Sequence, residues 1–212
     1  MRSTGRAGTS LLLREQPSGA PVTLRVRPAS SLDMGILSAH SNVQLGQRAM
    51  VFVDGTNLFH RLDAAKLQLV SLSRLIRACD PHREIVRVYL YTTQPHYERA
   101  LKSHGEALTS DVRVVLGEAI PTGDGNFREK GVDALLVADL IYHAAARNYQ
   151  QAILFSADQD FARALKRVED FGCRTMVASV AAQMPNALRE AADDTIEFDA
   201  KFLVENGYAR QA

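Results

Sequence analysis

The sequence predicts an α/β fold: a doubly wound, three-layer α/β/α domain with a mostly parallel central sheet over residues 49–212. The main observation is that short apolar runs alternate with helix-compatible segments from residue 49 onward. Strands that alternate with helices of about 10 to 15 residues are typical of crossover units, which build parallel sheets. In addition, a length of 212 residues suits one well-buried domain and is too short for two large ones.

Apolar runs predict the strands, and the segments between them predict the helices. The predicted strands cover 49–53, 84–91, 111–116, 151–155 and 174–179, with a short one at 195–198. The predicted helices cover about 57–63, 71–79, 95–109, 131–147, 159–171 and 185–193. Every predicted strand except the last is therefore followed by a helix, as a doubly wound fold requires.

Two predicted helices differ in their apolar pattern. Residues 159–171 place apolar side chains on one helical face and end at Gly172, so this helix is expected to pack on the sheet. Residues 131–147 are apolar around nearly the whole circumference and are expected to be largely buried. Asp133 and Asp139 are the acids of this second helix, and a buried charge must be paired, hydrogen-bonded or bound to a metal.

Residues 1–48 differ in composition from the rest of the chain. They hold seven serines, five glycines, three prolines and six arginines, but only two acids, Glu15 and Asp33. This composition predicts a flexible, weakly basic tail. A transit peptide or an arm that contacts RNA is the alternative interpretation. A start of translation at Met34 or Met50 is left open.

Composition excludes several classes of protein. The net charge of +1 gives no overall basic field, so a contact with nucleic acid would need a local patch. Cys79 and Cys173 lack a partner spacing, which indicates a reducing compartment. No histidine is paired with another histidine or a cysteine at a spacing that suits zinc. No apolar run approaches the roughly 20 residues that span a bilayer, so we expect a cytoplasmic protein without a membrane segment.

Acids follow two predicted strands at the point where each apolar run ends. Asp54 follows one run, and Asp158 and Asp160 follow another. Ligand sites in open α/β sheets lie outside the carboxyl ends of the strands. Carboxylates gathered there repel each other unless a proton or a cation joins them, so these acids and Asp133 point to a hard divalent metal. The alternative is that each aspartate only caps a helix, which does not explain a second acid at Asp160.

Two other phosphate chemistries find no support. The segment around Asp54 is similar to the Asp-x-Asp-Gly-Thr motif of aspartyl-phosphate phosphatases, in which the first Asp is the nucleophile. Phe52 occupies that position here, so the covalent route is unavailable. No glycine-rich phosphate loop or dinucleotide fingerprint follows any predicted strand.

Three blocks carry a resemblance to a known family: residues 51–58, 130–139 and 153–161. In content and order they resemble the NYN domains of the PIN-like nuclease superfamily. The resemblance covers about 49–180. It implies a PIN-like, Rossmann-like parallel sheet and a ribonuclease site that depends on Mg²⁺ or Mn²⁺.

Site residues follow from the resemblance by matching position. The implied catalytic, metal-binding carboxylates are Asp54, Asp133, Asp158 and Asp160. Asn57 and Ser156 would be polar supports. Asp139 matches a further acid of the family, but its spacing from Asp133 is about 240° around a helix, so it ranks second. Ala157 stands where relatives often carry glycine, which puts only the loop geometry in question.

The predicted flexible loop 117–130 contains candidate RNA contacts, namely Phe127, Arg128 and Lys130. Cations suit the RNA backbone, and an aromatic ring suits base stacking. A solvated loop with incidental charges is the alternative. Lys130 is better supported because it belongs to a block that matches the family.

The leading hypothesis is a metal-dependent endoribonuclease that hydrolyses phosphodiester bonds of RNA, single-stranded RNA in particular. One alternative is a non-catalytic RNA-binding or regulatory NYN module. Another is a metal-dependent phosphatase or nucleotidase, which would need a small closed pocket. A homo-oligomer or a protein partner is left open.

Overall fold

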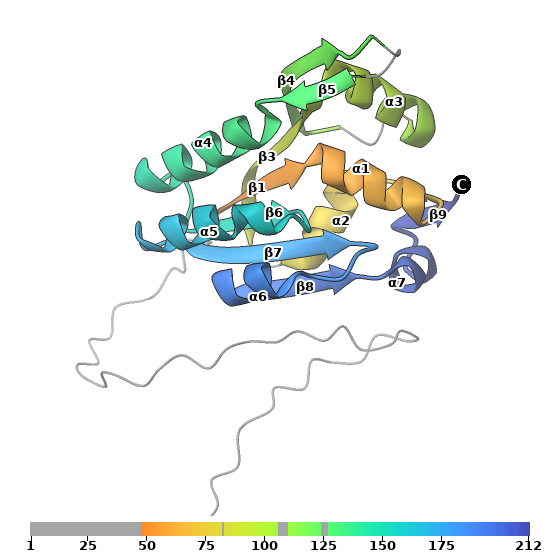
Figure 1. Cartoon of the computed structure of the whole chain (residues 1–212). Coiled ribbons are helices and arrows are strands. Elements are labelled where there is room, and N and C mark those ends of the chain that lie inside the picture. The colour runs from red at the N-terminus through yellow and green to blue at the C-terminus, as the bar shows by residue number, and fades with distance from the viewer. Residues whose placement is uncertain (1–47, 82, 106–109, 124–126) are drawn as a thin grey trace, which may run out of the picture.

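The computed structural model describes residues 48–81, 83–105, 110–123 and 127–212. A seven-stranded sheet forms the centre, in the order β5-β4-β3-β1-β6-β7-β8 (Figure 1). Its strands are β1 (Arg48–Asp54), β3 (Glu84–Thr93), β4 (Arg113–Pro121), β5 (Phe127–Lys130), β6 (Gln151–Phe155), β7 (Arg174–Val180) and β8 (Asp194–Phe198). Neighbouring strands are parallel except β5, which is antiparallel to β4. The predicted mostly parallel α/β sheet is thus confirmed. The predicted tail lies outside the described residues, apart from Arg48.

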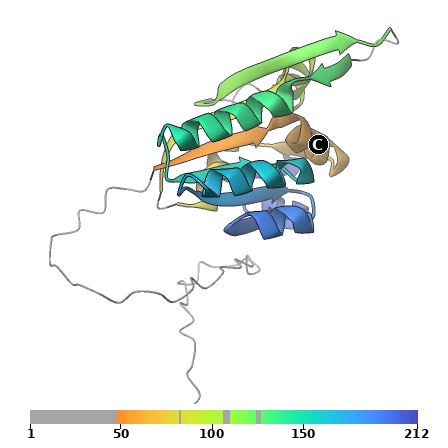
Figure 2. The same cartoon turned by 60° about the vertical axis from the view of Figure 1, so that its left-hand side comes forward.

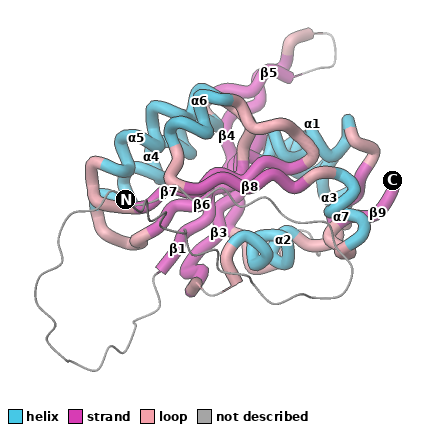
Figure 3. Tube along the Cα trace, turned by 90° about the horizontal axis from the view of Figure 1, so that it is seen from below, coloured by secondary structure: helices cyan, strands magenta, loops and turns pink. Residues whose placement is uncertain are grey.

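Helices cover both faces of this sheet. They are α1 (Gly55–Ala64), α2 (Leu72–Cys79), α3 (Gln94–His104), α4 (Val132–Ala145), α5 (Ala162–Glu169), α6 (Asn186–Ala191) and α7 (Ala200–Glu205). Buried residues of α1, α2, α3 and α7 share one core, and those of α4, α5 and α6 share the other. Figure 2 shows α4, α5 and α6 stacked on one face, and Figure 3 shows α2 on the opposite side of the strands. These are the three predicted layers.

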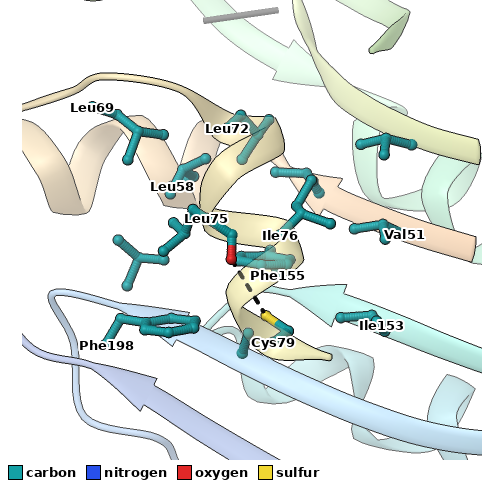
Figure 4. Packing of buried hydrophobic residues seen from close by; sticks show 14 of the residues in the cluster. Val51, Leu58, Leu69, Leu72, Leu75, Ile76, Cys79, Ile153, Phe155 and Phe198 are labelled. Atoms are coloured by element: carbon teal, nitrogen blue, oxygen red, sulfur yellow. Dashed lines mark hydrogen bonds between the residues drawn. The ribbon is translucent and has the colours of Figure 1, made fainter. Parts of the chain in front are cut away.

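The central strands are buried on both faces. In β1, Val51 and Val53 belong to the first core, whereas Met50 and Phe52 belong to the second, because successive side chains of a strand point to opposite faces. Figure 4 shows the first core, in which α2 packs over the sheet and Cys79 lies close to a carbonyl of its own helix. Both cysteines are free thiols. Among helices of the described ranges, none is long and apolar enough to cross a membrane.

The course of the chain places a switch point beside β1. From β1 the chain builds β3 and β4 on one side, and it then crosses through α4 to build β6, β7 and β8 on the other side. The carboxyl ends of β1 and β6 therefore flank the point at which the strand order reverses. In doubly wound sheets this is where ligands bind.

Helix α4 corrects one prediction. We expected it to be largely buried, but only one stripe faces the core, which consists of Val132, Leu136, Leu140 and Ala144. On the outer side, Leu135 is 39% exposed and Tyr142 is 63% exposed. The helix lies in an outer layer, and an outer helix contacts the sheet with one face whatever its other residues are.

The predicted loop 117–130 is a second correction. β4 continues to Pro121, and β5 returns beside it as an antiparallel strand. Gly117 matters at this point, because a Cβ there would lie 2.6 Å from Cγ2 of Val132. Glycine therefore lets the start of α4 approach β4 closely.

Three further elements were not predicted. The short strands β2 (Leu67–Leu69) and β9 (Ala209–Gln211) form an antiparallel pair of their own. Helix α7 follows β8 and starts at Asp199, whose side chain accepts a hydrogen bond from the Phe202 N–H at 2.7 Å. Elements of three to six residues are too short for an apolar period to be recognised.

Candidate active site

Asp54 is the last residue of β1 and lies at the switch point, 4% exposed. One carboxylate oxygen, Oδ1, accepts a hydrogen bond from the Asn57 N–H at 3.0 Å, and this bond caps α1. The other, Oδ2, accepts one from the Ser156 hydroxyl at 2.9 Å. The capping role that we weighed as an alternative is therefore present, but it occupies only one of the two oxygens.

The charge of Asp54 is unfavourable in this place. Burial is the main cause that raises its pKa to about 6, and the nearby charges of Asp133 and Asp158 add to it. The hydrogen bonds from Asn57 and Ser156 act in the opposite direction. A carboxylate held in this way binds a proton or a cation more readily than an exposed one.

The turn after β6 is bonded to the start of α1. Oγ of Ser156 accepts a hydrogen bond from the Asp158 N–H at 3.0 Å, besides the one it donates to Asp54. Oδ1 of Asn57 accepts one from the Ala157 N–H at 3.2 Å. Ala157 has no positive φ, so alanine in place of the family's glycine brings no backbone strain. Asn57 and Ser156 thus fix the distance between the two strand ends.

Asp158 and Asp160 lie on the next turn. Oδ1 of Asp158 accepts a hydrogen bond from the Asp160 N–H at 2.9 Å, which caps the short 3-10 helix η2 (Gln159–Phe161). Asp158 is half-buried and Asp160 is exposed. The backbone of the second acid is therefore held by the side chain of the first, while its own carboxylate faces solvent.

Asp133 lies in the first turn of α4 and is exposed, which corrects the prediction of an acid inside a buried helix. Partial burial still raises its pKa, and so do the charges of Asp158, Glu129 and Asp160. Through these interactions and those of Asp54, the four predicted metal-binding carboxylates form one electrostatic cluster.

Glu129 is a member of this cluster that the sequence analysis missed. Its Oε1 accepts hydrogen bonds from Oγ1 of Thr56 at 2.9 Å and Oγ1 of Thr93 at 3.3 Å, and it lies 2.9 Å from Nδ1 of His96. Glu129 directly precedes the family-matching block that begins at Lys130, but we treated its segment as a loop. If residues 127–130 had been predicted as a strand, Glu129 would have been expected to point to one face of the sheet, where it meets Thr56 of α1.

Asp139 has a different environment. Its Oδ2 accepts a hydrogen bond from the Tyr91 hydroxyl at 2.9 Å, and it belongs with β3 and the middle of α4. Burial and this bond raise the pKa of Tyr91. This hydrogen bond holds α4 on the sheet. A structural role of this kind agrees with the lower rank that we gave Asp139 as a site residue.

The candidate RNA contacts lie on β5. Phe127, Arg128 and Lys130 are all exposed, and Nζ of Lys130 pairs with Glu118 on β4 at 3.5 Å. Alternate residues of a strand point to opposite faces. Arg128 and Lys130 therefore point away from the face on which Glu129 meets Thr56, so the strand does not bring all the candidates together.

The donor set can be tested against a metal. Within the described ranges, no group of three His, Cys, Asp or Glu side chains is arranged to hold one ion, and none of the four predicted aspartates forms an ion pair with Lys, Arg or His. Mg²⁺ usually keeps several waters and uses one or two carboxylates plus substrate phosphate. Oxygen donors that repel one another at an open edge fit that requirement.

Comparisons with known proteins bear on the family and the fold of the chain. A family model described as NYN domain matches residues 48–199. The low amplitude and bright protein LabA of Synechococcus elongatus is 26% identical over 171 residues, which are 74% of this chain and 88% of LabA. The uncharacterized protein y4oD of Sinorhizobium fredii is 35% identical over 86 residues, so the match spans only 39% of the length of either protein.

A solved structure shares the fold. It is that of a Vibrio parahaemolyticus protein of unknown function, with a TM-score of 0.58 at 20% identity. The match covers 76% of this chain and 98% of that chain. At this identity the likeness supports the arrangement of the strands and helices and no more.

Proposed function

Since this chain belongs to the NYN domain family, we propose that it is a metal-dependent endoribonuclease that hydrolyses phosphodiester bonds of single-stranded RNA. NYN domains are PIN-like nucleases, so a hydrolase with an RNA substrate is the activity of the family. The proposal adds to the family assignment the dependence on Mg²⁺ or Mn²⁺, the internal cleavage and the preference for single strands.

One observation carries the proposal: within the described ranges, no Lys, Arg or His side chain forms an ion pair with any of the four clustered aspartates. Asp54 is buried with a pKa of about 6, and its charge and those of Asp133 and Asp158 act on one another. Near neutral pH most Asp54 side chains are ionised, so the repulsion persists in the free protein. A divalent cation would relieve it.

Each residue then has a distinct task. Asp54 and Asp158 would be the principal carriers of the ion, and Asp133 and Asp160 would hold it or its waters. When bound, Mg²⁺ or Mn²⁺ supplies an activated water and stabilises charge on the phosphate and the leaving 3′ oxygen. Asn57 and Ser156 keep the Asp54 carboxylate oriented through the hydrogen bonds at 3.0 and 2.9 Å. Asp133 and Asp160 are exposed, so this edge of the sheet is accessible to a long RNA substrate.

The test is cleavage of RNA that contains both single-stranded and structured regions, with Mg²⁺, with Mn²⁺ or with EDTA. We expect cleavage with either metal, none with EDTA, and strong loss in Asp158→Asn and Asp133→Asn. Asp170→Asn is the matched control, because Asp170 is an exposed aspartate that pairs with Arg167 at the end of α5. Activity that is independent of metal, or full activity in both site variants, would contradict the proposal.

A non-catalytic RNA-binding module is the second candidate. It is favoured by the lack of a three-ligand arrangement among the described side chains. This candidate predicts RNA binding that EDTA does not change, without cleavage under any metal. A phosphatase or nucleotidase would instead release phosphate from mononucleotides, which the same reactions can include. The proposal also includes a cytoplasmic location, and light scattering on the purified protein would test for a homo-oligomer.

A further inference from the structure

A hollow of about 120 Å³ lies between α1 and α3, next to the candidate active site. Thr56 lines it only two residues beyond Asp54, and His96 lines it from the start of α3. Both side chains also contact Oε1 of Glu129, at 2.9 Å each. The hollow and the carboxylate cluster therefore share a wall.

The floor of the hollow is apolar and uncharged. It is formed by Phe59, Ala100 and His104, which are 7%, 3% and 8% exposed. The ring of His104 stacks on that of Phe59, with ring centroids 5.6 Å apart. Nδ1 of His104 accepts a hydrogen bond from the Leu69 N–H at 3.2 Å, so the ring proton is on Nε2. Burial also lowers the pKa of His104, which keeps the ring neutral with one N–H donor at a fixed tautomer.

The rim of the hollow carries both donors and acceptors. Asp63 supplies an acceptor, and Arg99 and Ser103 supply donors. The negative charge of Asp63 reaches His104, and Glu129 lies behind His96. The carboxylate of Asp63 offsets the positive charge of Arg99 at this rim, and the floor is neutral. Such a lining suits an uncharged ring whose edge carries donors and acceptors, as a nucleobase does.

Size agrees with this ligand. An enclosed apolar cavity of about 150 Å³ holds a benzene ring. The hollow, at about 120 Å³, is slightly smaller but partly open, so it can take the edge of a base while the rest of the ring lies outside. Single-stranded RNA can turn an unstacked base into such a pocket. We propose that the hollow between α1 and α3 binds one unpaired nucleobase of the RNA, next to the phosphate at the carboxylates. This inference rests on the proposed function for its substrate class.

The first test needs neither metal nor cleavage. Adenosine, guanosine, cytidine and uridine are titrated into the full chain in EDTA, and the ring signals of His60, His96 and His104 are followed by NMR. At least one nucleoside is expected to shift them to saturation. Ser103→Phe, which fills the hollow, should weaken that binding by at least about tenfold, or about 1.4 kcal/mol. Lys102→Phe adds the same ring at an exposed position of α3 and should leave the binding unchanged.

Asp63→Asn is a second variant for the case that Ser103→Phe does not fold. It is expected to fold because Asp63 is exposed. It should change which nucleoside binds best, since an acceptor pair becomes a donor and an acceptor. Inorganic phosphate is the competing probe. Shifts of these signals by phosphate and not by nucleosides, or by neither probe, overturn the inference.

The second test separates this inference from the proposed function. In wild type, cleavage of an RNA with randomised sequence should favour one base at a fixed position, and Ser103→Phe should lose that preference. Nucleoside binding without any cleavage supports the pocket and overturns the nuclease. Cleavage without nucleoside binding, and with the same preference in Ser103→Phe, overturns the pocket and supports the nuclease.

Discussion

The two sides of the candidate site are built differently. On the side of β1 and β6, Asp54 is buried, both of its carboxylate oxygens accept hydrogen bonds, and Asn57 and Ser156 tie the strand ends together. On the side of β5 and α4, Asp133 is exposed at the start of a helix that follows an edge hairpin. The fold therefore fixes one half of the cluster, whereas the position of the other half depends on how the hairpin carries α4.

The largest effect is expected from Asp54→Asn, which removes charge from the fixed side. Activity should fall by at least about 100-fold, because even partners behind a metal ligand cost 10 to 100-fold. Stability should change in the opposite direction. The pKa of about 6 in the folded state lies above the ordinary value of 3.8, so this carboxyl stabilises the folded state below pH 4, and that contribution is lost as the pH rises through 6.

A rise of the pKa from 3.8 to about 6 corresponds to about 3 kcal/mol. In EDTA at pH 8, Asp54→Asn should therefore need more urea to unfold than wild type, and this advantage should shrink toward pH 4. Urea unfolding at several pH values measures the difference. Two results would show that ionised Asp54 does not destabilise the fold. One is equal stability of wild type and variant at pH 8, and the other is a wild type that gains stability relative to the variant from pH 4 to pH 8.

Ser156→Ala tests whether the fixed side depends on its hydrogen bonds. The variant removes the donor to Oδ2 of Asp54 and the acceptor for the Asp158 N–H. We expect metal affinity to fall by about 10 to 100-fold, measured by calorimetry with Mn²⁺. Ser73→Ala serves as the control, because its hydroxyl donates to the carbonyl oxygen of Ser110, which is no part of the carboxylate cluster. Unchanged affinity in Ser156→Ala would mean that packing alone orients Asp54.

Gly117→Ala perturbs the other side. The added Cβ would meet Cγ2 of Val132 at 2.6 Å and the carbonyl oxygen of Lys130 at 3.0 Å. The start of α4 must then move, and the fold should lose about 1 to 3 kcal/mol. Activity should fall through displacement of Asp133 while Asp54 keeps its raised pKa. Gly123→Ala is not a clean control because of its positive φ, so Ala119→Gly on β4 is preferable. Full activity in a destabilised Gly117→Ala would separate Asp133 from catalysis.

Lys130→Ala should have the smallest effect. Its ion pair with Glu118 is exposed on both sides, so stability should change by less than about 1 kcal/mol. If Lys130 contacts an RNA phosphate, the variant should weaken binding for all sequences, and the slope of log affinity against log salt should shrink by about 0.7. Lys166→Ala on the outer face of α5 provides the comparison. Identical salt slopes in wild type and Lys130→Ala would assign this lysine to the surface alone.

The fixed side was predictable from sequence, whereas on the other side Asp133 was predicted and Glu129 was not. Asp54 and Asp158 end apolar runs, and parallel strands bring such ends to one edge whatever the rest of the chain does. Glu129 joins the cluster because β5 pairs with β4. Strand pairing of this kind leaves no apolar period in a segment as polar as residues 127–130, so the sequence pattern did not predict β5. The exposure of α4 likewise depends on which elements lie outside it. Composition reports how apolar a helix is, but not how many neighbours it has.

The pairing of β2 with β9 affects the order in which the site can assemble. β2 follows α1 in the chain, and the side chain of Arg210 on β9 donates to Gln68 on β2 at 2.9 Å, across 142 positions of the chain. Contacts that join such distant segments form late, because the loop between them must close first. β2, which follows the far end of α1, is therefore expected to pair only after β9 has been synthesised. The far end of the helix that Asp54 caps is thus expected to become ordered later than the end that carries the carboxylate.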